Sequence, residues 1–395
     1  KLEAVVLKND ELTQPEREVA MIHVANILGR TFEEIGAIYP MFSLPNDPER
    51  FLRIIYYLGK LAIDETLADK KRTITFSAIL RERLGHHIHG EVWADAIKAV
   101  LVEKGLAERP VHIISANMHS VMNTLYAPLA LEEELSKKPI NKIYEDLSDS
   151  GNGNLRNRVM SLALKRGMTF LEDKSGANIN VQIFDTEQLN HPEKRFSVGE
   201  EAPVLIVMDY AFGEQAYETM DELLKPYNLG GEQLFMDVRS ISIMGKAGIL
   251  DGKKGDIMIP TAHLFEGTAD NYPFENELRK EDFAKDEVEV FEGAMISVLG
   301  TSLQNKDILR FFHDSTWNVI GLEMEGAHYQ KAIQSASKLR GNISPDVKVR
   351  YAYYASDNPL ETGSTLASGG LGTAGVRPTY LITNKILEQI FEDGK

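Results

Sequence analysis

Hydrophobic residues follow two different periods along this chain, and the change between them divides it into parts. From about residue 12 to 108, apolar positions recur three or four residues apart, as in amphipathic helices, in EREVAMIHVANILGRTFEEIGAIY, PERFLRIIYYLGKLAIDETL and GEVWADAIKAVLVEKGL. After Pro110, short β-branched runs alternate with helical stretches. The pattern predicts a helical N-terminal domain over residues 1–108, followed by α/β structure.

The α/β part divides again by the regularity of its pattern. Residues 109–202 are typical of a connecting region with short strands, helices and a polar, glycine-bearing loop near 146–154, DLSDSGNGN. From Pro203 onward, strands and helices alternate to the end of the sequence. Such alternation favours parallel strands joined by helices, so residues 203–395 are predicted to form a doubly wound, mostly parallel sheet.

Composition narrows the classes of protein that the chain can belong to. Its 395 residues include no cysteine, which excludes disulfides, thiolate metal sites and a catalytic cysteine. A formal net charge of −16 repels nucleic-acid phosphates and anionic lipid. No apolar run approaches the roughly 20 residues of a membrane span, and the first residues lack a signal-peptide pattern. We therefore expect a cytoplasmic protein with neither a nucleic-acid nor a membrane partner.

Polar residues follow five of the predicted strands at the point where each strand ends. In open α/β sheets, ligands bind outside the carboxyl ends of the strands, so these residues should meet at one rim. An unpaired carboxylate is costly to bury, which makes several converging acids a sign of function. The candidates are Glu214, the predicted turn Gly245-Lys246-Ala247-Gly248, Gln304, Glu323 with Glu325, and Asp357.

Three motifs in this part of the chain occur together in a known superfamily. They are Gly245-Lys246-Ala247-Gly248-Ile249-Leu250 followed by Gly255-Asp256-Ile257, then Glu323-Met324-Glu325-Gly326-Ala327, then Ser356-Asp357. In these motifs, residues 203–395 resemble the nucleoside phosphorylase and nucleosidase superfamily, which includes purine and uridine phosphorylases. The stretch Ser356-Asp357-Asn358-Pro359-Leu360-Glu361-Thr362-Gly363 is similar to the catalytic domain of AMP nucleosidases.

The resemblance implies cleavage of the N-glycosidic bond of a purine nucleoside or nucleotide, with release of the free base. It assigns Asp357 to protonation of the leaving purine, Glu325 to the ribose hydroxyls and Glu214 to the attacking water. It implies no metal and no cofactor, and it implies a homo-oligomer. The residues that it implies for substrate binding are Glu323, Met324, Gly245, Lys246, Ala247, Gly248, Gln304 and Ser356.

Two departures from the superfamily pattern keep alternatives open. Phosphorylases place an arginine two residues before the glycine motif to hold phosphate, and Ile243 occupies that position here, which favours hydrolysis. Lys246 replaces a small or polar residue and could instead hold phosphate, because lysine can serve as a point charge for it. A salt bridge with Glu214 is the structural alternative for Lys246. The competing functions are a phosphorylase that uses inorganic phosphate and a nucleoside-binding regulatory protein with a degenerate site.

Other polar patterns carry weaker functional interpretations. Residues 370–375 fit the glycine spacing of a dinucleotide fingerprint but lack the preceding strand and the later acid. His86, His87 and His89 are typical of a solvated surface. Asn117, His119 and Ser120 follow a predicted strand, where a helix N-cap is favoured over a second polar rim.

Overall fold

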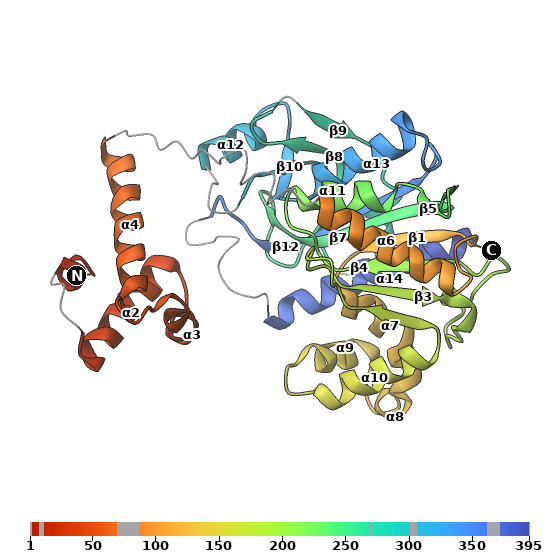
Figure 1. Ribbon diagram of the computed structural model, residues 1–395, viewed down its shortest axis with the longest axis horizontal. Helices are drawn as coiled ribbons and strands as arrows, with labels where there is room; N and C mark the ends of the chain where they lie inside the picture. The colour runs from red at the N-terminus through yellow and green to blue at the C-terminus, as the bar shows by residue number, and fades with distance from the viewer. Residues whose placement is uncertain are drawn as a thin grey trace. The chain divides into compact units, whose positions relative to one another are not determined.

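The computed structural model describes residues 2–7, 12–68, 87–268, 270–286, 288–300, 306–361 and 372–394 (Figure 1). Its contacts divide the chain into two compact units. The first is Lys1–Leu84, and the second is formed by Gly85–Leu366 with Leu371–Lys395. The last helix of the predicted N-terminal stretch, α6 (His87–Glu103), therefore belongs to the α/β unit.

The first unit contains the helices α1 (Leu2–Leu7), α2 (Gln14–Leu28), α3 (Phe32–Phe42) and α4 (Arg50–Ala68). The long helical pattern that begins near residue 16 is interrupted at Gly29, whose φ of 62° ends α2 in the left-handed conformation that glycine adopts readily. Thr31 then starts α3 with a capping box. One face of each helix packs into a small core that includes Val24, Ile35 and Leu52.

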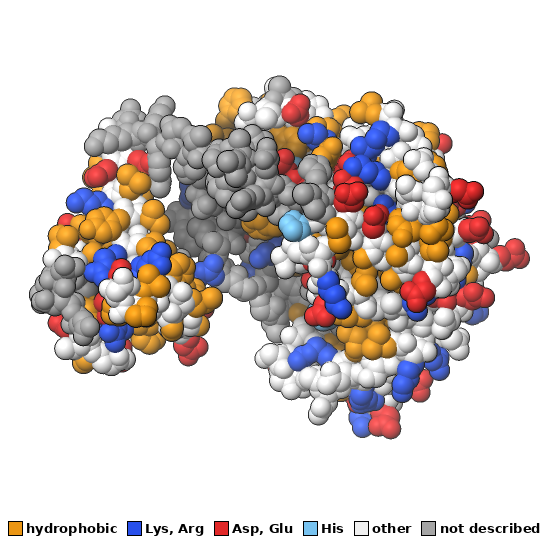
Figure 2. All heavy atoms as spheres, in the orientation of Figure 1, with side chains coloured by type: hydrophobic (Ala, Val, Ile, Leu, Met, Phe, Trp, Pro, Cys, Tyr) orange, Lys and Arg blue, Asp and Glu red, His pale blue; other side chains and the backbone are white. Residues whose placement is uncertain are grey.

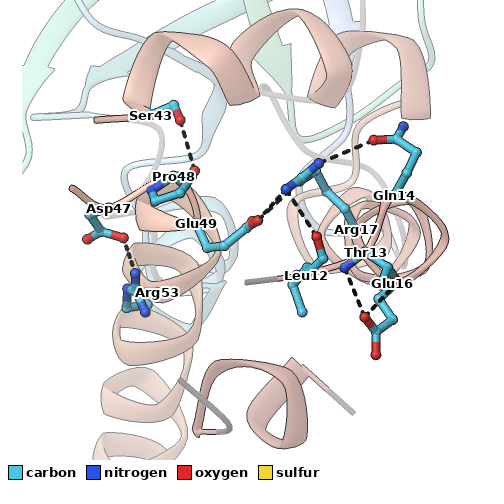
Figure 3. A network of polar contacts seen from close by, with 10 residues as sticks. All are labelled: Leu12, Thr13, Gln14, Glu16, Arg17, Ser43, Asp47, Pro48, Glu49 and Arg53. Atoms are coloured by element: carbon cyan, nitrogen blue, oxygen red, sulfur yellow. Dashed lines mark hydrogen bonds and ion pairs between the residues drawn. The ribbon is translucent and has the colours of Figure 1, made fainter. Parts of the chain in front are cut away.

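Polar contacts fix the start of α2 against the start of α4 (Figure 3). The guanidinium of Arg17 donates to Glu49, with Nη2 2.7 Å from Oε1, and the Glu49 side chain is only 9% exposed. Glu16 accepts hydrogen bonds from the backbone and the hydroxyl of Thr13, and Arg53 pairs with Asp47. Helices this short depend on such tertiary contacts, because isolated helices of this length are marginal in water.

The second unit is built on a ten-stranded sheet with the order β11-β10-β8-β12-β7-β1-β4-β3-β2, and β9 pairs with β8. The strands in chain order are β1 (Val111–Ser115), β2 (Met168–Leu171), β3 (Val181–Asp185), β4 (Val204–Met208), β7 (Val238–Ile249), β8 (Ile257–Phe265), β9 (Asn271–Pro273), β10 (Val290–Ser297), β11 (Val319–Glu323) and β12 (Lys348–Asp357). A separate hairpin pairs β5 (Tyr227–Leu229) with β6 (Glu232–Leu234).

The strand pairing confirms an α/β fold but does not confirm a doubly wound, mostly parallel sheet. β1 pairs in parallel with β4 and β7. The sheet is nevertheless mixed, because five pairs of strands are antiparallel: β2–β3, β3–β4, β8–β9, β8–β12 and β7–β11. Pairing of β11 with β7 closes β11, β10, β8, β12 and β7 into a ring of five strands. Alternation along the sequence predicts neighbouring elements, but it does not reveal that two distant strands close a ring.

Helices cover both faces of the sheet, and each face has its own hydrophobic core (Figure 1). Alternate residues of one strand enter the two cores, as Ile113 and Ile114 do, because successive side chains point to opposite faces. One face packs on α6, α11 (Gln215–Leu223) and α13 (Gly326–Gln334). The other packs on α7 (Met118–Ala130), α9 (Ile140–Ser148), α10 (Gly153–Lys165) and α14 (Val376–Asp393).

Short elements complete the second unit. The helix α8 (Glu132–Leu135) packs Leu135 against the second core, and α12 (Lys306–Asp314) contributes Leu309 to a smaller cluster. The brief helical turns are Thr186–Gln188, Lys194–Phe196, Lys280–Phe283, Ser335–Leu339 and Gly372–Gly375. Figure 2 shows acidic and basic side chains interspersed over the face drawn. None of the helices in the described ranges is long and apolar enough to cross a membrane.

Candidate functional site

Gly248 lies between β12, which carries Asp357, and β11, which ends two residues before Glu325. On one side it pairs with Leu322 of β11, and on the other with Asp357 of β12. A side chain at this position would collide with Leu322, since a Cβ would lie 2.8 Å from its Cδ2 atom. Two strand spacings separate the Cα atoms of Leu322 and Asp357, about 10 Å. The structure therefore brings the ends of β11 and β12 together.

The glycine motif itself differs from the prediction. Gly245-Lys246-Ala247-Gly248 was expected to form a turn after a strand, but these residues lie inside β7, which runs from Val238 to Ile249. The strand continues because Gly248 permits β11 to approach closely and close the ring. Lys246 therefore projects from a strand, where it pairs in register with Tyr354 of β12.

Glu323 is fully engaged by the protein around it. Its Oε2 accepts the backbone N–H groups of Glu325, at 2.5 Å, and of Gly326, and its Oε1 accepts the hydroxyl of Ser297. His263 Nδ1 lies 3.5 Å from Oε1, and both side chains are completely buried. Burial opposes ionisation, but His263, Ser297 and the Gly326 amide together hold the pKa of Glu323 below its usual value. These contacts make Glu323 an anchor for the start of α13.

Glu325 is the more available of the two glutamates. Its Oε1 accepts a hydrogen bond of 3.1 Å from the backbone N–H of Gly213, in the loop between β4 and α11. Burial and the nearby carboxylate of Glu323 raise the pKa of Glu325 to about 7. A glutamate with this pKa exchanges protons near neutral pH, which is the property expected at functional sites.

Asp357 ends β12 as a buried carboxyl group, with 6% of the residue exposed. Its Oδ1 accepts the hydroxyl of Ser356 at 2.6 Å, while its buried Oδ2 has no hydrogen-bond partner among the described residues. Burial raises the pKa of Asp357, against the opposing effects of Ser356, Lys246 and Lys254. A buried carboxyl group with a raised pKa and an oxygen that lacks a partner is suited to act on a ligand as an acid.

Lys246 is exposed and lines a cavity of about 450 Å³ between α7, the α9–α10 loop and the start of α14. The salt bridge with Glu214 considered from the sequence is not formed, and within the described part of the chain Lys246 makes no ion pair. Asn117, His119 and Ser120 line the same cavity. Asn117 also caps α7 by accepting the His119 backbone N–H at 3.0 Å, so the predicted N-cap is confirmed and the polar rim exists beside it.

The remaining predicted residues occupy varied surroundings. Glu214 is exposed and directly follows Gly213, the residue that Glu325 binds, so it lies at the same edge. Met324 is partly buried against the cluster that contains Leu250 and Leu322. Ser356 also donates to the Ala247 carbonyl at 3.1 Å. Gln304 lies outside the described residues, as do His86 and the first two residues of the glycine-rich segment 370–375.

Sequence reasoning did not assign roles to several residues that build this site. His263 and Ser297 hold Glu323, and the Asn358 side chain fixes the loop after β12 by donating to the Leu250 carbonyl at 3.2 Å. Tyr353 lies beside Gly326, where a Cβ would come within 2.8 Å of its hydroxyl oxygen. A buried glutamate requires polar partners, and His263 is a histidine within a mostly apolar strand. This position in the sequence was the available indication that His263 contacts a buried acid.

Across the described residues, no three His, Cys, Asp or Glu side chains are grouped so that they could hold a metal ion. His89, considered from the sequence as part of a surface cluster, instead has Nδ1 2.7 Å from the carbonyl oxygen of Ser175.

Comparison with known proteins assigns the chain to a family. Residues 140–392 match the model of a family described as a family of unknown function, DUF6909, and this match spans more than half of the chain. The chain therefore belongs to that family. No curated protein matches it in sequence.

The chain is similar to solved structures of nucleosidases. A 5′-methylthioadenosine/S-adenosyl homocysteine nucleosidase from Campylobacter jejuni shares 11% identity, with a TM-score of 0.42 over 72% of this chain and 99% of that one. Futalosine hydrolase of Helicobacter pylori shares 13%, with a TM-score of 0.41 over 70% and 97%. The corresponding Neisseria meningitidis nucleosidase, in complex with methylthio-immucillin-A, shares 9%, with a TM-score of 0.43 over 72% and 99%.

Proposed function

We propose that this protein hydrolyses the N-glycosidic bond of a purine nucleoside or nucleotide and releases the free base. The observation that carries the proposal is Asp357, a buried acid with a raised pKa and an oxygen that lacks a partner among the described residues. Glu325 follows β11, which pairs with Gly248 on the side opposite β12, and it is a second carboxyl group with a pKa near neutral pH.

These two acids suit the chemistry of glycosidic cleavage. The bond between C1′ and N9 breaks with its electron pair left on the purine, and a proton from Asp357 at N7 neutralises the departing base. Glu325 stabilises the cationic ribose by accepting hydrogen bonds from its hydroxyls. Water then adds to C1′, and the proton that it loses restores Asp357. The orientation of this water by Glu214 stays a prediction.

Phosphorolysis is the second candidate, favoured by one feature. Lys246 is a cation beside Asp357 that forms no ion pair with a described residue, and it could hold inorganic phosphate. Ile243, at the position of the phosphorylase arginine, favours hydrolysis instead. A regulatory protein that binds a nucleoside without cleaving it is the third alternative. A cytoplasmic location and a homo-oligomeric state are part of the same proposal.

One assay separates the three functions. The purified protein is incubated with a panel of purine nucleosides and their 5′-monophosphates, with and without inorganic phosphate, and free base is measured. Release without phosphate supports the nucleosidase, and a strict phosphate requirement supports the phosphorylase. Binding with no release from any member of the panel would leave the regulatory protein.

A further inference from the structure

We propose that the cavity between α7, the α9–α10 loop and α14 binds a phosphate group, carried either by the substrate or by free phosphate. The identity of the substrate rests on the proposed function, but the binding of the anion is a property of the cavity alone. Its volume of about 450 Å³ is large enough for a phosphate with a sugar attached.

The charge of the cavity wall differs from that of the protein as a whole. The chain carries a formal net charge of −16, yet no Asp or Glu is among the described residues that line the cavity. Lys246 and Arg156 both line it. A local positive surface against an acidic background is the condition under which an anion is drawn to one place.

Neither cation is neutralised by a carboxylate within the described ranges. Arg156 donates to backbone carbonyl oxygens of the α9–α10 loop, those of Leu147 at 3.3 Å, Ser150 at 2.8 Å and Asp149. These acceptors are uncharged, so Arg156 holds the loop in place and retains its positive charge. Lys246 is exposed and also lines the cavity.

Two helices add to this field. The N-terminal ends of α7 and α14 both reach the cavity, through Asn117 and through Gly375 with Val376. The amino end of a helix carries a partial positive charge that favours anions within its first turn. The two dipoles therefore act in the same direction as Lys246 and Arg156.

A buried polar side chain supplies independent evidence for an occupant. Asn123 lines the cavity with 2% of its surface exposed, and its Nδ2 donates to the Tyr380 hydroxyl at 2.8 Å. Its buried Oδ1 has no partner among the described residues. Such an acceptor requires a donor, which a sugar hydroxyl or a protonated phosphate oxygen supplies. A phosphate monoester of a sugar satisfies both the cations and this acceptor.

The cavity also adjoins the strand that ends at Asp357. Tyr354 lines it, and Tyr354 is three residues before Asp357 on β12 and pairs with Lys246 across the strands. A ligand whose base contacts Asp357 can therefore extend its phosphate towards Lys246.

Calorimetric titration of the full chain with inorganic phosphate tests the binding directly. We expect Lys246→Ala to weaken phosphate binding about tenfold or more, the loss of a charge-assisted hydrogen bond. Lys254→Ala is the matched control, because Lys254 also acts on Asp357 but does not line the cavity, and it should leave phosphate affinity unchanged. Asn123→Asp, which adds a negative charge without changing size, should abolish binding. The inference is overturned if wild type binds no phosphate or if Lys246→Ala and Asn123→Asp bind it normally.

Kinetics identify the source of the phosphate. A higher KM of Lys246→Ala for a nucleoside 5′-monophosphate, but not for the nucleoside, indicates a substrate phosphate. Loss of phosphate dependence with a nucleoside indicates inorganic phosphate. Equal losses on nucleotide and nucleoside contradict the anion site. If free base is released but phosphate does not bind, the anion site is contradicted and the proposed nucleosidase activity is retained. If phosphate binds but no base is released, the anion site is retained and the proposed nucleosidase activity is contradicted.

Discussion

Glu325 accepts a hydrogen bond from the backbone N–H of Gly213, with 3.1 Å between Oε1 and the nitrogen. This contact joins the start of α13 to the loop after β4, two segments more than 100 residues apart. It orients one carboxyl oxygen of Glu325 through the protein itself. The other oxygen is left to interact with a ligand, and the pKa of the group decides its charge when it does so.

Stability should depend on pH through Glu325. Burial raises its pKa to about 7, from an ordinary value of 4.5 in the unfolded chain. Between these values the folded protein holds a proton that the unfolded chain has released, so the free energy of unfolding falls as pH rises from about 4.5 to about 7. Above pH 7 the effect is constant. The full loss is at most about 3 kcal/mol.

Glu325→Gln removes this titration. Relative to wild type, the variant should gain stability progressively between about pH 4.5 and 7, as measured by urea unfolding at several pH values. Glu214→Gln, at an exposed glutamate of the adjacent loop, serves as the control and should not produce this trend. A difference between Glu325→Gln and wild type that does not vary with pH would refute the raised pKa.

The two glycines of the β7 motif should respond differently to alanine. A Cβ at Gly248 would lie 2.8 Å from Leu322 Cδ2 and 3.4 Å from Pro359 Cδ, whereas the nearest atom at Gly245 is 3.6 Å away. Overpacking at Gly248→Ala should cost about 1–3 kcal/mol, and Gly245→Ala should cost less. Thermal unfolding of both variants measures the difference. Equal melting temperatures would show that β11 does not pack against β7 in this way.

Asp357→Asn tests the acid assigned to the leaving base. Asparagine keeps the shape but cannot deliver a proton, so turnover should fall about 10²–10⁴-fold with a smaller change in substrate affinity. Because burial raises the pKa of Asp357, the activity that depends on its protonated form should decline as pH rises through that pKa. The variant should lose this decline from its pH–rate profile. Unchanged turnover would remove Asp357 from the mechanism.

Much of the fold could be predicted from local pattern alone. The helices before residue 104 and the strands at β4, β11 and β12 follow from hydrophobic spacing, which local geometry determines. Closure of the five-strand ring could not be predicted, since it depends on pairing of β7 with β11, about 70 residues later. The same closure explains why Gly245–Gly248 is strand and not turn.

Only the part of the candidate site that lies within the three sequence motifs could be predicted from the sequence. Glu323 and Asp357 lie on β11 and β12, which both pair with β7 at Gly248. The sequence could not reveal that both carboxylate oxygens of Glu323 are occupied by contacts with Ser297, His263 and two backbone amides. Ser297 and His263 come from other strands, so their proximity to Glu323 depends on the tertiary fold. The cavity beside Lys246 was equally hidden, since its walls come from α7, the α9–α10 loop and α14.

The N-terminal helical unit should unfold separately from the α/β unit. Arg17→Ala leaves the nearly buried carboxylate of Glu49 without its partner, which should destabilise that unit by about 1–3 kcal/mol. Arg30→Ala, which removes an exposed i,i+4 pair of 3.8 Å with Glu34, is the control and should cost about 0.5 kcal/mol or less. Calorimetry of the full chain should show one transition lowered by Arg17→Ala and another unmoved. A single transition that shifts as a whole would contradict two independent units.

The most direct test of the central claim is product analysis in ¹⁸O-labelled water. The purified protein is incubated with purine nucleosides and 5′-monophosphates, and the products are measured by mass spectrometry. Hydrolysis at C1′ predicts free purine together with a ribose, or ribose 5-phosphate, that carries one ¹⁸O atom, and Asp357→Asn should suppress both. Pentose 1-phosphate without label, or no free purine from any substrate with folded protein, would contradict the account.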